Sequence, residues 1–596
     1  MKVIYNSRDL NFKKPFGAVK TGQKVFIKLK LQTMKEVTGV SLFLRSDSYK
    51  NKFSLTPLKN KEYSLEFSVD DPEIYYYRFE VYTHNKTYYV GHNGQGIAIV
   101  GEWLPEWQLT VYDKNFATPE WLKGGLIYHI FPDRFARVSD GIKVEKENAI
   151  IRSWYQELSI QDAEGKYFAN DFYGGNIKGV ISKLEYLRDL GVSAIYFSPI
   201  FKSSSNHRYD TGDYFEIDPL FGTEEEFKLL LKEAKKLGIE IILDGVFNHT
   251  GADSVYFNKF GNYNSVGAYQ STFSEYYDWY TFYNYPNDYH CWWGVTVCPT
   301  ISRNAKGFQD MIAGPGGVIE KWSLMGVKGW RLDVVDEISD AFVEKIRERS
   351  KKHGDVVVIG EVWEDASTKI SYDEKRKYLL GKELDGVMNY PYKEAIIDLL
   401  KTGDMQSFIN QVYTIAENYP KEALDCSMTL LGTHDTVRII NVLSGVIPPA
   451  TKKERLAYRL SDIDYERGRK LLRVASLIQY FLPGVATVYY GDEVGVEGFE
   501  DPINRRPFPK TGGDKILLAH YQSLGKMRKQ YREKFKGKFK INIENDILVI
   551  DREGLKAMVN LSQETIRIKP QEDILSKKVV SKLNRYDFIV VDSLML

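Results

Sequence analysis

The stretch GWRLDVVDE, residues 329–337, places an arginine and an aspartate two positions apart inside an otherwise apolar run. Apolar runs of this length are typical of buried strands. An unpaired charge inside such a strand is strongly unfavourable. Side chains two positions apart on a strand point to the same face, so Arg331 and Asp333 should lie side by side. Either they form a structural buried ion pair, or this face meets solvent and a ligand at the end of the strand.

The surrounding sequence favours the second explanation, because short apolar segments alternate with amphipathic helical stretches from about residue 122 onward. Two of the helical stretches are EEEFKLLLKEAKKLG (224–238) and DAFVEKIRERSKKHG (340–354). The predicted strands are residues 126–132, 193–199, 240–246, 329–335, 356–362, 384–390, 428–434 and 486–492. Eight β–α units in series predict a (β/α)8 barrel, in which the carboxyl ends of the strands line the active site. For the last three strands the count rests partly on a family resemblance described below.

The barrel is one of three predicted domains, so the fold class is multidomain α/β. Residues 1–117 contain short, partly alternating segments such as KTYYVGH (86–92), which predict an N-terminal β-sandwich. Residues 118–530 form the predicted barrel. A stretch rich in Tyr, Trp, Asn and Gly at about 250–305, after the third strand, is interpreted as a small inserted domain. Residues 531–596 return to strand–turn patterning, which predicts a small C-terminal β-sandwich.

The charge and cysteine content argue against several classes of function. The 81 basic and 80 acidic residues give a net charge of +1, which offers no electrostatic basis for binding nucleic acid or an anionic membrane. Cys291, Cys298 and Cys426 are too few and too scattered for a disulfide framework or a zinc site. The N-terminal sequence MKVIYNSRDL lacks the apolar core of a signal peptide, and no run of about 18 apolar residues could span a membrane. A cytoplasmic protein is therefore expected.

Further polar residues follow the ends of other predicted strands. Asp244, Asn248 and His249 follow the third strand. Glu361 and Trp363 follow the fifth, two positions apart, and the pair His434–Asp435 follows the seventh. Each has a structural alternative: an aspartate caps a helix, a histidine satisfies a core hydrogen bond and a tryptophan packs. Acids at the ends of four strands nevertheless converge on one barrel mouth, and this favours a catalytic site.

These segments also resemble a known enzyme family. DGVFNH (244–249), GWRLDVVDE, GEVW (360–363) and LLGTHD (430–435) resemble the four short conserved regions of glycoside hydrolase family 13, the α-amylase family. NHRYDTGDYFEIDPLFGT (206–223) and YGDEVGVEGFEDPINRRPF (490–508) are similar to its further segments. The N-terminal β-domain, FYGGN, the VW after the acid and the DPxxRRP segment resemble the neopullulanase, cyclomaltodextrinase and maltogenic amylase branch. The similar neopullulanase–amylopullulanase branch is the alternative.

The resemblance implies a retaining mechanism with two carboxyl groups about 5–5.5 Å apart, one nucleophilic and one acid/base. It identifies Asp333 as the nucleophile, Glu361 as the acid/base and Asp435 as a third carboxylate that binds sugar hydroxyls. Arg331 should keep Asp333 ionised. Glu361 lies beside two other carboxylates, which should leave it protonated and able to act as an acid.

The resemblance also implies substrate-binding residues around the catalytic acids. His249 and His434 match histidines that bind sugar hydroxyls, and Asp244 matches the aspartate that pairs with Arg331. The remaining matches are Tyr209 as a stacking residue, with His207 beside it, Trp363 beside the acid, Trp293 as a platform in the inserted domain, and Asp501 with Arg505 at the non-reducing side.

No cofactor is expected to be required, and no metal ligand is assigned. In much of this branch a turn after the first strand binds calcium, but here that turn reads FARVSDGIKVEKE. Asp140 and the later Asn176 are too few hard oxygen ligands for a dedicated site. Asn248 matches a calcium ligand of some α-amylases, although its partners are not identifiable in the sequence.

The expected partner is an α-glucan, and the resemblance also implies a homodimer. The N-terminal domain resembles a starch-binding module, with a plain structural cap as the alternative. Residues 441–467 have no assigned role and are interpreted as a helical decoration, a lid or an oligomer contact.

The favoured function is a retaining hydrolase of α-1,4-glucosidic bonds, and some α-1,6 bonds, in maltooligosaccharides, cyclodextrins, pullulan or starch. Predominant transglycosylation is one alternative, because both reactions pass through the same intermediate. A non-catalytic glucan-binding protein is another, since fold does not fix function. A metal-dependent barrel hydrolase would need a cluster of ligands that the nine histidines do not provide.

Overall fold

The structure is a computed structural model that describes residues 1–138, 146, 149–158, 160 and 169–593. The chain divides into two compact units. The first comprises Met1–Thr118 with Glu364–Asp385 and Gln406–Leu424; the second comprises Pro119–Trp363, Gly386–Met405 and Asp425–Leu596. Within the described residues, no helix is both long and apolar enough to cross a membrane.

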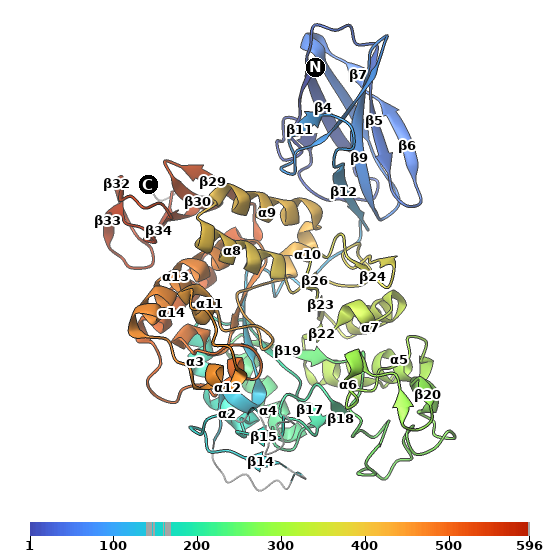
Figure 1. The fold of residues 1–596 in the computed structure, drawn as a ribbon, viewed down its shortest axis with the longest axis vertical. Helices are drawn as coiled ribbons and strands as arrows, with labels where there is room; N and C mark the ends of the chain where they lie inside the picture. The colour runs from blue at the N-terminus through green and yellow to red at the C-terminus, as the bar shows by residue number, and fades with distance from the viewer. Residues whose placement is uncertain (139–145, 147–148, 159, 161–168, 594–596) are drawn as a thin grey trace. The chain divides into compact units, whose positions relative to one another are not determined.

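The second unit contains the expected barrel of eight parallel strands. Figure 1 labels four of them, β19, β22, β23 and β26. The strands are β13 (Leu126–Ile130), β16 (Ala194–Phe197), β19 (Glu240–Gly245), β22 (Gly329–Leu332), β23 (Val357–Gly360), β26 (Gly386–Val387), β27 (Met428–Leu430) and β28 (Val485–Tyr489). They pair in the order β26–β23–β22–β19–β16–β13–β28–β27. A parallel bridge between Met388 and Met428 joins the two ends of this order and closes the barrel. The predicted fold class is therefore confirmed.

Alternate residues of the strands fill the barrel interior. One buried cluster contains Ile127, Tyr196, Ile242, Ile359, Met388, Leu430 and other strand residues of the same alternation. Moving two residues along the strands leads from Ile242 to Asp244, and from Ile359 to Glu361. The inward face therefore changes from apolar to charged at the carboxyl ends of the strands, as a period of two residues requires.

Amphipathic helices follow the strands. α4 (Glu224–Lys236) begins with a capping box made by Thr223 and Glu226, and buries Phe227, Leu230 and Ala234. The other helices of the barrel region include α2 (Ile177–Ser182), α3 (Leu184–Asp189), α5 (Lys306–Ala313), α6 (Val318–Met325), α7 (Asp340–Lys352), α8 (Tyr390–Thr402), α11 (Ile439–Ser444), α12 (Lys452–Ala457), α13 (Asp462–Phe481) and α14 (Lys515–Gln530).

Two excursions leave the barrel after its second and third strands. The first is the hairpin of β17 (Phe201–Ser203) and β18 (Thr211–Ile217). The second contains η2 (Tyr277–Trp279), β20 (Phe282–Asn284), β21 (Asp288–Tyr289) and η3 (Trp292–Gly294). It coincides with the expected inserted region, and a bridge between His249 and Thr300 joins its two ends.

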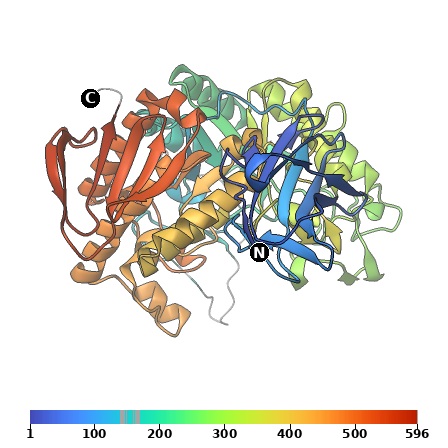
Figure 2. The ribbon, with the colours of Figure 1, turned by 90° about the horizontal axis from the view of Figure 1, so that it is seen from above.

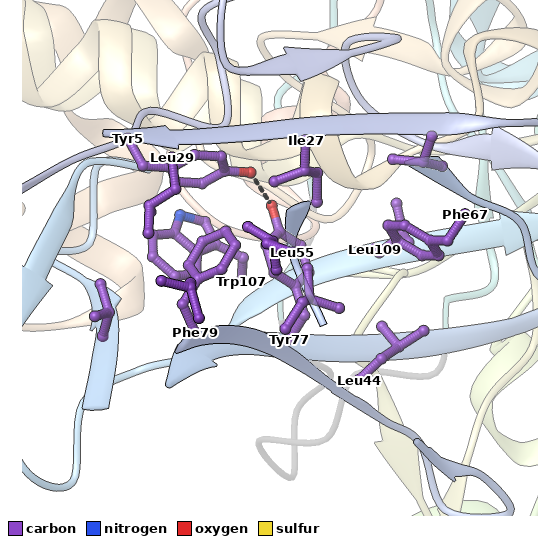
Figure 3. Close-up of a cluster of buried hydrophobic side chains, with 14 of the residues drawn as sticks. Tyr5, Ile27, Leu29, Leu44, Leu55, Phe67, Tyr77, Phe79, Trp107 and Leu109 are labelled. Carbon is purple, nitrogen blue, oxygen red and sulfur yellow. Dashed lines mark hydrogen bonds between the residues drawn. The ribbon is translucent and has the colours of Figure 1, made fainter. Parts of the chain in front are cut away.

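The first unit contains two sheets around one core, as the sequence predicted. One sheet pairs β1 (Lys2–Ile4), β2 (Lys13–Lys14), β4 (Val25–Gln32), β7 (Thr56–Pro57) and β8 (Glu62–Phe67). The other pairs β3 (Val19–Lys20), β5 (Gly39–Arg45), β6 (Lys50–Ser54), β9 (Glu73–Tyr82), β10 (Thr87–His92), β11 (Ala98–Val100) and β12 (Trp107–Tyr112). Figure 3 shows the shared core, in which the hydroxyls of Tyr5 and Tyr77 lie 2.7 Å apart and Trp107 stacks on Tyr77.

Two segments from the middle of the chain belong to this first unit. Arg8 contacts Glu417 at 3.0 Å, and Thr110 donates to the carbonyl of Asn418. The segment Gln406–Leu424 contains α10 (Lys421–Cys426) in part and most of α9 (Met405–Asn418). The unit is therefore larger than the residues 1–117 assigned to the N-terminal domain from sequence.

The C-terminal strands form two antiparallel sheets with their own core. β29 (Lys540–Glu544), β30 (Ile547–Arg552), β31 (Leu555–Asn560) and β34 (Phe588–Asp592) make one sheet, visible in Figure 2, and β32 (Ile566–Glu572) pairs with β33 (Val579–Leu583). Ile547, Val549, Leu583 and Ile589 lie in the core between them.

A buried carboxyl group lies just after the last barrel strand. Glu493, in η5 (Asp492–Val494), accepts hydrogen bonds of 2.7 Å from the hydroxyls of both Tyr128 and Tyr186. The backbone N–H of Gly491 donates to its other oxygen at 2.9 Å. Burial raises the pKa of Glu493 from 4.5 to about 7, although both tyrosines act in the opposite direction.

This raised pKa predicts how stability depends on pH. The folded state binds the Glu493 proton more tightly than the unfolded state, so stability falls as pH rises from about 4.5 to about 7. The Glu493→Gln variant should lose this dependence and be more stable than wild type above pH 7, by roughly 1–3 kcal/mol. Its amide can donate to both tyrosine hydroxyls and accept from Gly491.

Urea unfolding at several pH values measures the free energy of unfolding of wild type and variant. Glu533→Gln, at a side chain that is 82% exposed, is the control, and equal pH slopes for wild type and Glu493→Gln would contradict the account.

Candidate active site

Arg331 is the centre of the polar cluster at the carboxyl ends of the strands. Its Nη1 donates to both oxygens of Asp244, at 2.9 and 3.0 Å, and to Oδ1 of Asp333 at 2.7 Å. Its Nη2 lies 3.0 Å from Oε2 of Glu361. Asp244, in the adjacent strand β19, is the register partner of Arg331 in β22. Asp333 follows directly after the end of β22, two residues after Arg331. One guanidinium therefore contacts three carboxyl groups, all of them buried.

Two tyrosines complete the environment of Asp244. The hydroxyls of Tyr196 and Tyr209 donate to Asp244 Oδ2 at 2.6 and 2.9 Å. The Tyr209 hydroxyl also lies 2.5 Å from Nε2 of His434, and the two rings stack in parallel with centroids 5.1 Å apart. Tyr196 escaped the sequence analysis, although its position two residues after Ala194 on a barrel strand places it on the inward face.

The backbone just after Asp333 is strained and contacts Glu361. Val334 has φ 45° and ψ 45°, a left-handed conformation that is costly for a β-branched residue. In this conformation its N–H donates to Glu361 Oε2 at 2.9 Å. The hydrogen bond from this strained residue therefore links the end of β22 directly to the end of β23. It holds the residue after Asp333 against Glu361.

Burial changes the ionisation of this cluster. It raises the pKa of Asp333 well above its usual range; Arg331 opposes this effect, whereas Glu361, Asp244 and Asp435 reinforce it. Burial also raises the pKa of Asp244, again against the effect of Arg331. Arg331 lowers the pKa of Asp333, in the direction expected from the sequence, but burial outweighs this effect because the single guanidinium is shared among several carboxyls. That Asp333 is ionised in the enzyme stays a prediction. The assignment of the transferable proton to Glu361 stays a prediction.

The histidines of the site are neutral near pH 7, because burial lowers their pKa values. The pKa of His249 falls to about 4, and that of His434 lies well below its ordinary value, to which Arg505 and Arg331 also contribute. His249 Nε2 contacts the carbonyl oxygen of Tyr209 at 3.2 Å. The pKa of His207 is lowered as well, and its Nδ1 accepts from the N–H of Tyr209 at 3.0 Å. These rings act as hydrogen-bonding groups rather than as charges.

Aromatic residues surround the charged cluster. Trp363, which is 45% exposed, stacks on Tyr390 at 4.0 Å and donates to Glu361 Oε1 at 3.3 Å. In the inserted region, the 83% exposed Trp293 donates to Oε1 of Glu337 at 2.6 Å. The sequence analysis did not single out Tyr390 or Glu337. Glu337 ends the stretch GWRLDVVDE, and its position just after the strand that carries Arg331 is the signal that could have indicated it.

Asp435, Arg505 and Asp501 form a second charged group. Arg505 donates to Asp435 Oδ1 at 3.3 Å and pairs with Asp501 at 2.7 Å. Asp435 Oδ2 also lies 3.1 Å from Nε2 of His434. Because His434 contacts Tyr209, which donates to Asp244, a continuous chain of contacts connects Asp435 to the Arg331 cluster. The side chain of Asp435 is 34% exposed, so it faces solvent more than Asp244, Asp333 and Glu361 do.

Two of the residues weighed for calcium, Asn176 and Asn248, contact other groups of the protein. Asn176 caps α2 and accepts from Gly179, and the Asn248 amide lies 3.4 Å from Glu337. Asp140 lies outside the described residues. Across the part of the chain that the structure describes, no group of three or more His, Cys, Asp and Glu side chains is arranged to hold a metal ion.

Comparison of the chain with known proteins identifies its family. The α-amylase catalytic-domain model matches residues 129–307 and 308–540. The chain belongs to the α-amylase family.

Curated relatives of this α-amylase family member include amylopullulanases and cyclomaltodextrinases. An amylopullulanase from Thermoanaerobacterium saccharolyticum is 33% identical over 92% of this chain and 46% of its own length. A cyclomaltodextrinase from Geobacillus thermopakistaniensis is 31% identical over 78% of this chain and 74% of its own. The chain spans less than half the length of the three amylopullulanases that it matches. The type III pullulan hydrolase from Thermococcus kodakarensis shares the fold, with a TM-score of 0.67, 21% identity and coverage of 99% of this chain and 100% of that one.

The Tyr196 hydroxyl should matter for activity as well as for stability. In Tyr196→Phe, Asp244 loses one of its buried donors, which costs about 1–3 kcal/mol in unfolding free energy. Asp244 would then hold Arg331 less rigidly, and we expect kcat/KM on a glucan to fall roughly tenfold. Tyr173→Phe is the matched control, because it also removes a hydrogen bond, of 2.7 Å to the carbonyl of Gln156, but away from the Arg331 cluster. Equal kcat/KM in both variants would show that Tyr196 has no positioning role.

Proposed function

We propose that this α-amylase family member hydrolyses α-1,4-glucosidic bonds with retention of configuration at the anomeric carbon. The observation that carries the proposal is that Asp333 and Glu361 both contact the same Arg331 guanidinium, at 2.7 and 3.0 Å. Two carboxyl groups held beside one another at the mouth of a barrel are what a double displacement requires. The strained Val334 N–H supports the same arrangement by donating to Glu361.

In the first step, the Asp333 carboxylate attacks the anomeric carbon while Glu361 transfers its proton to the glycosidic oxygen. The carbon–oxygen bond of the leaving sugar breaks as the ester bond to Asp333 forms. Arg331 stabilises the ionised form of Asp333 that this attack needs. The step starts from the state in which Asp333 is ionised and Glu361 carries the proton, as a double displacement requires.

In the second step, Glu361 accepts a proton from a water molecule, whose oxygen attacks the anomeric carbon and releases Asp333. Asp435 and the neutral His434 supply acceptors and donors for sugar hydroxyls. Trp363 and Tyr209 offer ring faces, which suit the apolar faces of glucose residues. A sugar hydroxyl in place of water would give transglycosylation by the same route.

We propose an α-glucan as the substrate, with α-1,4 bonds as the main target and α-1,6 bonds as a further one. The support lies in the relatives, which include amylopullulanases, cyclomaltodextrinases and neopullulanase 2. Maltooligosaccharides, cyclodextrins, pullulan and starch are therefore the substrates to compare. No cofactor is included in the proposal, because each step uses side chains and water alone.

The roles of Asp333 and Glu361 can be told apart with azide. Both Glu361→Ala and Asp333→Ala should lower kcat on maltoheptaose by at least about 10³-fold. With an activated α-glucosyl substrate, azide should restore turnover in both variants. Glu361→Ala should yield an α-glucosyl azide, because azide attacks the Asp333 ester. Asp333→Ala should yield the β-anomer, because azide attacks the substrate directly. NMR of the products measures the configuration, and the opposite pattern would reverse the two assignments.

Failure of folded wild type to cleave maltoheptaose, β-cyclodextrin, pullulan or starch would contradict the hydrolase proposal altogether. Circular dichroism of each variant provides the folding control. Chromatography of the products would separate hydrolysis from transfer, because transfer yields oligosaccharides longer than the substrate.

The acid limb of the pH profile should report Asp333. Attack requires this carboxylate to be ionised, and burial raises its pKa well above 3.8. The value of kcat/KM should therefore fall as pH drops through a pKa clearly above that of an ordinary aspartate. His249 and His434 should not contribute, since their pKa values are lowered. Initial rates on maltoheptaose across pH test this, and an acid limb at or below pH 4 would contradict it.

A further inference from the structure

The segment 446–460, which contains α12 and belongs to the stretch 441–467 left without a role, makes a set of polar contacts with one loop. That loop, residues 497–506, carries Asp501 and Arg505. Arg455 Nη1 donates to Glu500 Oε1 at 2.6 Å. The N–H of Leu460 donates to Glu497 Oε2 at 2.7 Å. In the reverse direction, Arg506 Nη2 donates to the carbonyl of Leu456 at 2.6 Å.

Packing reinforces these contacts. Tyr458 meets the buried Phe499 edge to face, with ring centroids 5.7 Å apart. Arg459 and Arg506 both pair with Glu157, which adds a third segment of the chain to the same junction. Contacts from several directions therefore fix the segment against the loop.

Arg455 also organises its own segment. Its Nε donates to the carbonyl of Pro449 at 2.6 Å, and its Nη2 to that of Ala450 at 3.1 Å. A capping box of Thr451 and Glu454 starts α12 next to these carbonyls. A single guanidinium thus holds the turn before the helix and, at the same time, the carboxyl of Glu500.

The far side of the loop reaches the candidate active site. Asp501 follows Glu500 directly and pairs with Arg505 at 2.7 Å. Arg505 donates to the carbonyl of His434 at 3.0 Å and to Oδ1 of Asp435 at 3.3 Å. The loop therefore connects α12 on one side with Asp435 on the other.

We infer that the segment 446–460 is a buttress that positions the loop 497–506, and through Arg505 positions Asp435 for substrate binding. Arg455 and Glu500 are the positioning residues of this buttress; neither contacts the catalytic acids. The inference rests on the proposed glycoside hydrolysis for its kinetic consequence, but not for its structural one. It assigns to the unexplained stretch a role other than a decoration, a lid or an oligomer contact.

A displaced loop should affect KM more than kcat. Arg505 contacts Asp435 before any bond breaks, so loosening it weakens the binding of substrate and transition state alike, and this raises KM. A purely structural role of Arg455 would instead reduce the folded fraction, which lowers the apparent kcat and leaves KM unchanged. The two explanations therefore differ in the parameter that changes.

The experiment compares Arg455→Ala, Glu500→Ala, the double variant and Arg455→Lys with wild type on maltotetraose. Each alanine variant should raise KM about threefold to tenfold, with kcat within about twofold of wild type. The double variant should be no worse than Arg455→Ala, because Glu500→Ala removes only a contact that Arg455→Ala already lacks. Arg455→Lys keeps a cation for Glu500 and should restore most of the wild-type KM. Lys453→Ala, at an exposed residue of the same helix, is the matched control.

Hydrogen exchange supplies a readout that needs no activity. Amide exchange in residues 497–506 should be faster in Arg455→Ala and Glu500→Ala than in wild type or Lys453→Ala. Unchanged KM and unchanged exchange in this loop would overturn the inference. If wild type cleaved no glucan, the proposed function would fail, whereas the exchange experiment would still test the buttress.

Discussion

The sharing of Arg331 among Asp244, Asp333 and Glu361 is the constraint on which the rest of the site depends. One guanidinium cannot fully compensate three buried carboxyl groups, so burial raises the pKa values of Asp333 and Asp244 in spite of it. The cluster therefore favours the uptake of a proton. A double displacement needs one carboxyl group that is ionised and another that carries a proton. A cluster in which one guanidinium serves several buried carboxyls suits this need, because ionising all of them at once is unfavourable.

The geometry of the barrel brings these groups together. β19, β22 and β23 are neighbours in register, and the inward positions continue from apolar residues to Asp244, Arg331 and Glu361. Because side chains two positions apart on a strand share a face, the stretch GWRLDVVDE predicted that Arg331 and Asp333 lie side by side. The contact of 2.7 Å between them confirms this prediction. The same rule applied to Ala194 would have found Tyr196. The first five barrel strands, the N-terminal sheets and the C-terminal sheets were likewise predictable, because their strands carry clear apolar patterns. The count of the last three barrel strands rested partly on the family resemblance.

What the sequence could not predict arises from contacts between distant loops. The left-handed Val334 is not visible in a pattern, since nothing in a Val-Val pair indicates a positive φ. The net pKa shift of Asp333 is hidden for a similar reason: the sequence reveals that Arg331 and Asp333 share a face, but neither how deeply they are buried nor how many carboxyls share the guanidinium. The segments of the first unit that come from the middle of the chain, such as Gln406–Leu424, were also hidden, because they resemble ordinary barrel helices.

The most direct test of the central claim is the identity of the residue that forms the covalent intermediate. A slow fluorinated α-glucosyl substrate should leave a glucosyl ester on the protein, and peptide mass spectrometry can locate it. We predict a label on Asp333 that is removed by maltose as an acceptor or, more slowly, by water. A label on Glu361 or Asp435 would contradict the arrangement around Arg331, and the absence of any ester during turnover would contradict the double displacement.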